Sequence, residues 1–197
     1  MIDQVLEVTR KEVNDYIDDK LGGAAGENRV VLTSFVDDSG NIAIPDDSVG
    51  LIMLNIEEEK QLKMTGLVQK QQSENTSSFI NPAVNLNLHI MFASHFNQYD
   101  ESLKHISYII SFFQQKPYFD SDNTPAIATL ETSRLLFDWT TINLEQLHYI
   151  WSVLGTRYLP SVIYKVRMLS IQSQESTKDV ANIKEIIVNA NKKDVND

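Results

Sequence analysis

The fold is decided where the chain reads Tyr158-Leu-Pro-Ser-Val-Ile-Tyr-Lys-Val-Arg-Met-Leu169. Apolar residues dominate this stretch and predict a buried β-strand over residues 160–171. Lys165 and Arg167 take alternate positions in it, so one face of the strand is expected to meet solvent or a partner. Beyond the strand the chain turns polar and continues as a C-terminal arm, residues 172–197. This layout, a strand that ends a folded body beside an arm able to reach outward, is typical of an assembly component.

The preceding sequence alternates between helical and strand patterns. Residues 2–21 carry apolar side chains at helical spacing, and a second helix is expected between Asp100 and Pro117. Asn143 with Gln146 gives the capping-box signal of a third helix. The strands expected before the last one are residues 29–35, 49–57, 84–92, 126–130 and 134–139. This order predicts an α+β fold with a mixed, mostly antiparallel sheet flanked by helices.

Two polar segments stand apart from this body. Residues 58–82 are rich in Gln, Ser, Asn and Lys. A connection of this length within a compact domain is usually functional or mobile, so a protruding loop is predicted. The chain is therefore expected to comprise a domain over residues 1–171, with the loop at 58–82, and an arm over residues 172–197 that makes assembly contacts.

The arm carries apolar residues at helical spacing, although residues 186–188 fit a strand equally well. Burying its apolar side chains is worth roughly 8–10 kcal/mol. Ordering about 15 residues costs about 1–2 kcal/mol each, which is more. The folded body or a neighbouring subunit must therefore hold the arm, and a neighbour is favoured.

The composition is that of a globular protein and excludes several classes of partner. The 197 residues carry a net charge of -10 and no cysteine. An acidic surface without a Lys/Arg cluster repels phosphate groups, so nucleic acid and anionic membranes are poor partners. No apolar run approaches the ~20 residues that span a bilayer. The amphipathic, acidic N-terminal segment does not resemble a signal peptide, and a cytoplasmic site of synthesis and folding is expected.

The sequence holds no catalytic or metal-binding motif. Its histidines, His89, His95, His105 and His148, are scattered, and no carboxylate sits at metal-ligand spacing to the first two. Neither a glycine-rich phosphate loop nor a nucleophile motif occurs. We therefore expect no enzymatic activity, no metal and no cofactor. A hydrolase would need a buried carboxylate pair in a deep cleft.

Partner binding is the role expected of the charged strand residues and of the arm. Three consecutive glutamates leave the strand 49–57, and an acid/base centre there would need one of them held in an apolar pocket. Adjacent strand residues alternate faces and reach water, which favours a solvated strand end able to meet basic groups of a partner. The predicted partner-binding residues are Glu57, Glu58, Glu59, Lys165, Arg167, Val180, Ile183, Ile186, Ile187 and Val188.

A series of stretches spread over residues 2–171 carries a family resemblance. They are Ile2-Asp-Gln-Val-Leu6, Leu54-Asn-Ile-Glu-Glu-Glu59, Asn81-Pro-Ala-Val-Asn-Leu-Asn-Leu-His-Ile-Met-Phe-Ala93, Phe112-Phe-Gln-Gln-Lys-Pro117, Leu144-Glu-Gln-Leu147 and the strand quoted at the outset. In this order they resemble the cap, or tube-and-sheath terminator, protein of contractile injection systems. That family includes the antifeeding prophage and the related virulence-cassette particles.

The resemblance implies a fold like that of phage tail terminators, assembled as a six-fold ring. Such a ring sits on the end of the inner tube distal to the baseplate, stops tube growth and anchors the last sheath layer. The implied partners are other copies of the chain, the inner tube protein and the sheath protein, without direct membrane insertion. The implied location is the bacterial cytoplasm during assembly and then the injection particle. The alternative is an adaptor elsewhere in the same particle, at the baseplate or at a membrane attachment.

Overall fold

The structure is a computed structural model that describes residues 1–22, 28–59, 68–71, 76–80, 84–130, 132, 134–155, 157–171 and 178–181. Its contacts divide the chain into two compact units. The first unit comprises residues 1–63 and 84–171, and the second comprises residues 64–83 and 172–197.

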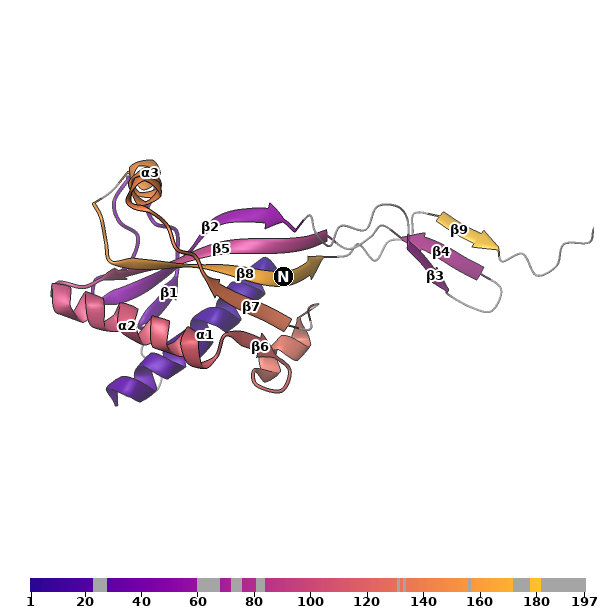
Figure 1. Cartoon of the computed structure of the whole chain (residues 1–197), viewed down its shortest axis with the longest axis horizontal. Helices are drawn as coiled ribbons and strands as arrows, with labels where there is room; N and C mark the ends of the chain where they lie inside the picture. Colours follow the sequence, from indigo (N-terminus) through magenta and orange to yellow (C-terminus); the bar gives the residue numbers. More distant parts are fainter. Residues whose placement is uncertain are drawn as a thin grey trace, which may run out of the picture. The chain divides into compact units, whose positions relative to one another are not determined.

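Six strands form the sheet of the first unit (Figure 1). Only β1 and β2 run parallel, and every other neighbouring pair is antiparallel. The expected mixed, mostly antiparallel sheet is therefore confirmed. In spatial order the strands are β1 (Val30–Leu32), β2 (Ser48–Glu58), β5 (Val84–His95), β8 (Ser161–Ile171), β7 (Arg134–Trp139) and β6 (Tyr118–Asp120).

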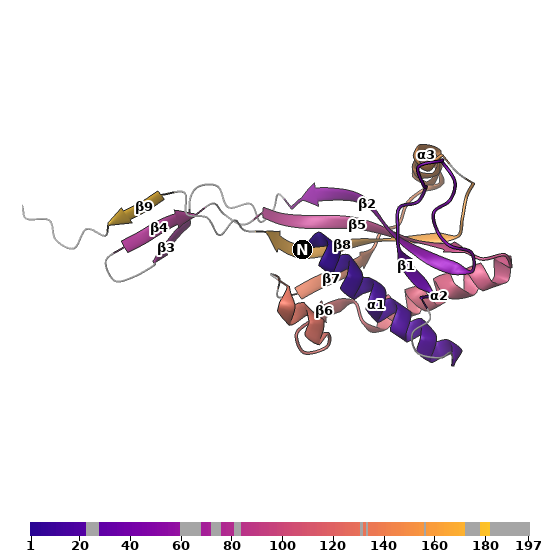
Figure 2. The ribbon, with the colours of Figure 1, turned by 180° about the vertical axis from the view of Figure 1, so that it is seen from behind.

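Helices α1 (Ile2–Leu21) and α2 (Tyr99–Gln115) cover one face of this sheet, as Figure 2 shows from behind. The main core lies between these helices and the sheet. Burial in this core raises the pKa of Tyr164 to about 12, because the charged phenolate would lose its hydration. Alternate residues of the two central strands point into it: Leu88, Ile90 and Phe92 from β5, and Val162, Tyr164 and Val166 from β8.

Helix α3 (Leu144–Leu154) and the segment of residues 33–47 cover part of the opposite face. There Ile52, Met91 and Ile163 of the central strands pack against Phe35 and Trp151 in a second, smaller core. Successive residues of a strand point to opposite faces, so the central strands supply apolar side chains to both cores. In the described part of the chain, α3 and residues 33–47 bury this second face of the sheet.

The capping box expected for the third helix and the expected end of the second helix before Pro117 are confirmed. The side chain of Asn143 accepts a hydrogen bond from the Gln146 amide at 2.8 Å, and the Asn143 amide donates to the Gln146 side chain at 3.0 Å. This is the capping box expected at the start of α3. Gly22 ends α1 at φ +63°, a left-handed conformation that glycine adopts without steric cost. Helix α2 ends at Gln115, just ahead of Pro117.

The segment predicted as a loop at residues 58–82 contains two strands, β3 (Val68–Gln71) and β4 (Thr76–Ile80). They pair antiparallel, and β9 (Lys178–Ala181) of the arm pairs with the other side of β4. Their polar sequences lack an alternating apolar pattern, and β9 comes from about a hundred residues further along the chain. Neither feature is visible to a local reading of hydrophobic periodicity, so the pairing of these strands could not be predicted from the sequence.

Two predictions were wrong in detail. The strand expected over residues 126–130 is a 3₁₀ helix, Pro125–Thr129. Thr124 and Ile127 are buried at a spacing of three, which is the period of a 3₁₀ helix, and Pro125 supplies a φ suited to its first turn. The strand expected over residues 29–35 spans only Val30–Leu32, and the three-residue edge strand β6 was missed.

Candidate functional site

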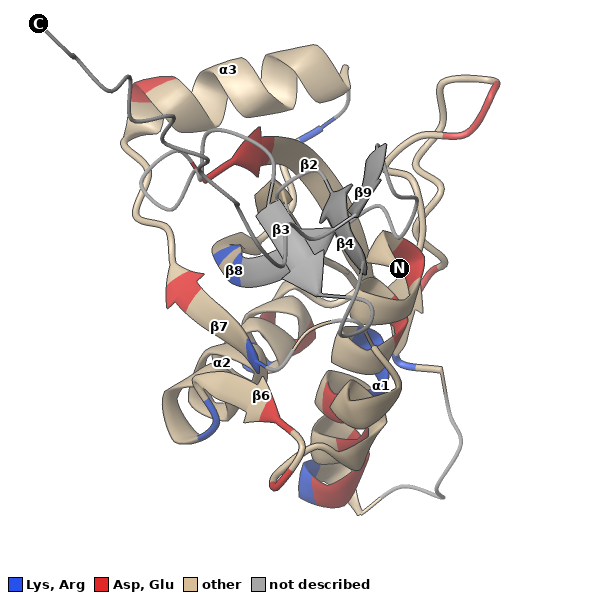
Figure 3. Ribbon diagram, turned by 90° about the vertical axis from the view of Figure 1, so that its right-hand side faces the viewer, with Lys and Arg blue, Asp and Glu red and all other residues tan. Residues whose placement is uncertain are grey.

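A group of charged side chains lies on the α3 face, beyond the part that α3 and residues 33–47 cover among the described residues. Strands β2, β5 and β8 continue beyond α3, and their side chains on this face change from apolar to polar. Figure 3 shows acidic residues at the ends of β2 and β7 with basic residues on β8 between them. We call this surface, formed by Glu57, Asn87, His89, Asp138, Lys165 and Arg167, the charged face.

Strand register explains why these residues meet. His89 of β5 lies opposite Lys165 of β8, and Lys165 lies opposite Asp138 of β7. Residues two apart on a strand share a face, so Asn87 joins His89 and Arg167 joins Lys165. The charged face is therefore a direct consequence of the alternation that also buries the main core.

Two ion-pair clusters organise the charged face. The Glu57 carboxylate lies 3.1 Å from Nε2 of His89 and 3.9 Å from Nζ of Lys165. Nε of Arg167, also on β8, lies 2.5 Å from the carboxylate of Asp138 on the neighbouring strand β7. The Glu57, Asp138 and Arg167 side chains are nearly half exposed, and exposed pairs of this kind contribute only about 0–1 kcal/mol to stability. The half-exposed carboxylates of Glu57 and Asp138 are thus available for recognition at little cost to the fold.

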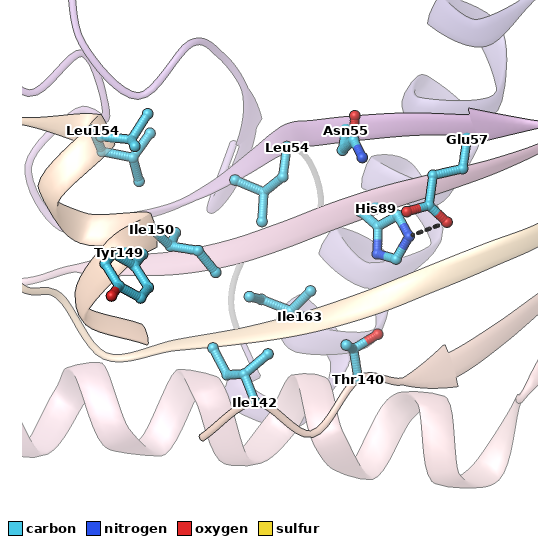
Figure 4. A pocket seen from close by; sticks show the side chains of 11 residues that line it. Leu54, Asn55, Glu57, His89, Thr140, Ile142, Tyr149, Ile150, Leu154 and Ile163 are labelled. Atoms are coloured by element: carbon cyan, nitrogen blue, oxygen red, sulfur yellow. Dashed lines mark ion pairs between the residues drawn. The ribbon is translucent and has the colours of Figure 1, made fainter. Parts of the chain in front are cut away.

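A pocket of about 400 Å³ adjoins the charged face beneath α3 (Figure 4). Leu54, Ile150 and Ile163 give it apolar walls, and the Glu57–His89 pair closes one end. The β-bulge between Met53 and Asn55 places both Leu54 and Asn55 on this side of β2. Apolar walls with a few polar groups at one end are typical of a binding pocket.

The apolar surface of the pocket continues outward onto α3. Tyr149 and Val153 line the pocket and yet are 60% and 87% exposed. Leu144 at the start of the same helix is 83% exposed. Exposed large apolar side chains grouped beside a pocket indicate a surface that another protein covers.

The structure brings together some of the sequence-predicted site residues. Glu57 and Lys165 contact each other, and Arg167 lies on the same face. Glu59 accepts a hydrogen bond from Nδ2 of Asn87 at 2.9 Å. Glu58 follows Glu57 at the exposed end of β2, on the opposite face by strand alternation.

The arm residues fall into two groups. Val180 lies in β9, so the start of the apolar stripe is a strand and not a helix. Ile183, Ile186, Ile187 and Val188 lie outside the described residues. Sequence reasoning missed His89, Asp138, Tyr149 and Val153, although the alternation of Asn87 and His89 with buried leucines was a signal for the second strand of the charged face.

The chemistry of this site is ion pairing and apolar contact. Within the described part of the chain, no group of three or more His, Cys, Asp or Glu side chains is arranged to hold a metal ion. Burial lowers the pKa of His105, but this residue lies on α2 and does not line the pocket. None of the described helices is long and apolar enough to cross a membrane.

Comparisons with known proteins point to one family. Residues 4–184 match the Pvc16 N-terminal domain. The PVC sheath/tube terminator of an extracellular contractile injection system, solved in its extended state, has a similar fold with a TM-score of 0.60. The two chains are 13% identical, and the match covers 91% of this chain and 62% of that one.

The tube-terminating cap of the anti-feeding prophage is a second similar structure, with a TM-score of 0.55 and 15% identity. That match covers 90% of this chain and 60% of the cap. This chain therefore spans about three-fifths of the length of both proteins. A search of curated protein sequences found no match.

Proposed function

Since this chain belongs to the family of Pvc16 N-terminal domains, we propose that it is the structural cap protein of a phage tail-like contractile injection system. In this proposal it terminates the inner tube and anchors the last layer of the sheath. Both similar structures are tube terminators or caps of such particles, which supports the assignment. The chain acts by binding the end of a polymer and not by catalysis.

The observation that carries the proposal is the charged face beside an exposed apolar pocket. A terminator must bind the last ring of a tube and offer no surface on which the next ring can grow. Half-exposed ion pairs exchange partners at small cost, and the apolar rim on α3 gains free energy when it is covered. The predicted contact residues Glu57, Lys165 and Arg167 lie on this face, and it is our candidate for the contact with tube or sheath.

The cap is proposed to be a homo-oligomer, a six-fold ring that matches the tube. A ring requires a head-to-tail contact between two different surfaces of the same chain, and the contact must close. The arm that follows β8 supplies one such surface, which is why we assign it to contacts between subunits or with the sheath. Assembly in the bacterial cytoplasm precedes incorporation into the particle.

Electron microscopy of particles that carry a tagged chain tests the position. A cap places the tag at the end of the tube distal to the baseplate, and at that end only. An adaptor, the second candidate, places it at the baseplate or at a membrane attachment. A tag at the baseplate, or one scattered along the sheath, overturns the cap assignment.

A further inference from the structure

The pocket beneath α3 combines apolar walls with a single carboxylate. Leu54, Ile150 and Ile163 lie between the ring of Tyr149 at one end and the carboxylate of Glu57 at the other (Figure 4). Among the described residues that line the pocket, Glu57 is the only acidic one, and none is a lysine or an arginine. The pocket is therefore suited to an elongated apolar group that ends in a positive charge.

Two basic side chains lie near the Glu57 carboxylate without saturating it. Nε2 of His89 lies 3.1 Å away but lacks the geometry of a hydrogen bond. Nζ of Lys165 lies 3.9 Å away, beyond the roughly 2.7–3.2 Å of an N–H···O hydrogen bond. An ionised carboxylate has sites for about four hydrogen bonds. The Glu57 side chain is 48% exposed, so its carboxylate is open to donors from another molecule.

Arginine is the amino acid that matches both features. Its methylene stem packs along apolar surface while the charged end stays polar. Its guanidinium group is always charged and donates two parallel hydrogen bonds to a carboxylate. A lysine ammonium is a strongly hydrated point charge, and Lys165 already places one near Glu57. We propose that the pocket binds an arginine side chain of the inner tube protein, with the guanidinium on Glu57.

The outer rim of the pocket adds a requirement for an apolar neighbour. Tyr149 and Val153 lie one turn apart on α3 and are 60% and 87% exposed. An apolar side chain close to the arginine covers both residues, which is favourable because apolar surface leaves water. The proposal rests on the tube binding proposed above and specifies the chemistry of that contact.

Charge favours a partner other than a second copy of this chain. The net charge of -10 means that two copies repel each other. Around the pocket, Glu145 is exposed on α3, and Asp138 on β7 is already paired with Arg167, which leaves Glu57 as the carboxylate that awaits a closer partner. The inner tube is the polymer whose growth the chain is proposed to stop, so the arginine is assigned to the tube protein.

Nuclear magnetic resonance of the full-length chain tests the pocket directly. The probe is a tripeptide of leucine, alanine and arginine with both ends blocked, in which the first and third side chains share a face when extended. It is expected to shift the methyl signals of Leu54, Val153 and Ile163. The same tripeptide with citrulline, an uncharged analogue of arginine, is expected to bind about fivefold more weakly, because it loses the charge-assisted hydrogen bonds to Glu57.

Two variants locate the effect. Glu57→Gln is expected to weaken the arginine tripeptide by the same factor of about five. The matched control is Glu101→Gln on α2, whose carboxylate is 37% exposed and is also paired with a lysine, and it is expected to leave the affinity unchanged. Absence of shifts at the pocket, equal affinity for the citrulline tripeptide, or an equal loss in the control overturns the proposal. The citrulline comparison uses the parent chain and does not depend on the folding of any variant.

Binding to tubes of purified inner tube protein then tests the source of the arginine. The parent chain and Glu101→Gln are expected to occupy tube ends at the same concentration, and Glu57→Gln only at a concentration about fivefold higher. Unchanged end binding by Glu57→Gln refutes the arginine contact and leaves the cap assignment standing. A parent chain that binds the tripeptide but no tube end refutes the cap assignment instead. Loss of binding to sheath protein alone would assign the arginine to the sheath and overturn the tube as its source.

Discussion

Gly50 shows how closely the α3 face is packed. This residue lies in β2, and a Cβ atom built on it would come within 2.7–2.8 Å of the side chain of Ile44, which is fully buried. Ile44 belongs to the segment that crosses this face ahead of β2. Glycine is required here for close approach and not for an unusual backbone conformation.

We expect Gly50→Ala to lower the free energy of unfolding by about 1–3 kcal/mol, because the added methyl group overpacks the second core. Urea denaturation measures the change. The matched control is Asn55→Ala at an exposed position of the same strand, which is expected to stay within about 0.5 kcal/mol of the parent chain. Equal stability of the two variants would contradict the packing described for Gly50.

His105 gives the fold a pH dependence. Its Nδ1 donates a hydrogen bond to the Glu101 carbonyl at 2.8 Å, and its ring stacks on Phe96 at 4.2 Å. Burial lowers its pKa below the ordinary value of 6.5, since the charged imidazolium would lose its hydration. Below pH 6.5 the unfolded chain therefore binds more protons at this residue than the folded chain does.

The free energy of unfolding is expected to fall as the pH drops through 6.5 and further through the lowered pKa of His105. Urea titrations at a series of pH values between 5 and 8 measure this slope. His105→Gln keeps a polar side chain that does not titrate, so its slope in the same interval should be shallower. An unchanged slope in the variant would assign the pH dependence to other groups.

At the scale of elements, the capping box stabilises the first turn of α3, the helix that covers the pocket. The Asn143 side chain satisfies one of the free amides of the first turn. Asn143→Ala should cost about 1 kcal/mol of stability and loosen the N-terminal turn. Chemical denaturation measures the loss of stability. Amide hydrogen exchange measures the loosening of the turn, and faster exchange confined to α3 is expected. Global loss of protection would mean that α3 supports the whole fold.

The sequence was sufficient for the elements whose signals are local. All three helices, the cap of α3 and the strands β2, β5, β7 and β8 follow from periodicity and from residues such as Asn143 and Gln146. The strands β3, β4 and β9 could not be predicted in this way, because their polar residues gain a sheet only by pairing with partners distant in sequence. Tertiary context also decided between strand and 3₁₀ helix for Pro125–Thr129.

The candidate site was predictable only in part. Lys165 and Arg167 were identified from their alternation along one strand, and Glu57 from its place at the end of another. Their contact, however, depends on the register between β2, β5 and β8, which hydrophobic pattern alone does not specify. Asp138 was missed for the same reason, since its role arises from a neighbour in space.

At the scale of the molecule, the two units make different contributions to the proposed function. The first unit holds the charged face and the pocket, and β9 pairs with β4 inside the second. Removal of residues 172–197 is expected to leave the first unit folded and soluble, with its unfolding transition retained, and to yield particles without a stable cap. A shorter deletion of residues 182–197 preserves β9 and removes only the rest of the arm. Normal capped particles from both truncated chains would show that the arm has no assembly role.

The central claim is that this chain ends a polymer by binding to its tip. An assay of tube elongation tests this claim most directly. Purified inner tube protein is allowed to polymerise with increasing amounts of the full-length chain, and tube lengths are recorded by electron microscopy. The account predicts that tubes stop growing at substoichiometric amounts, with the chain bound at one end and their mean length set by the ratio of the two proteins. Tubes of unchanged length with no chain at either end would contradict it.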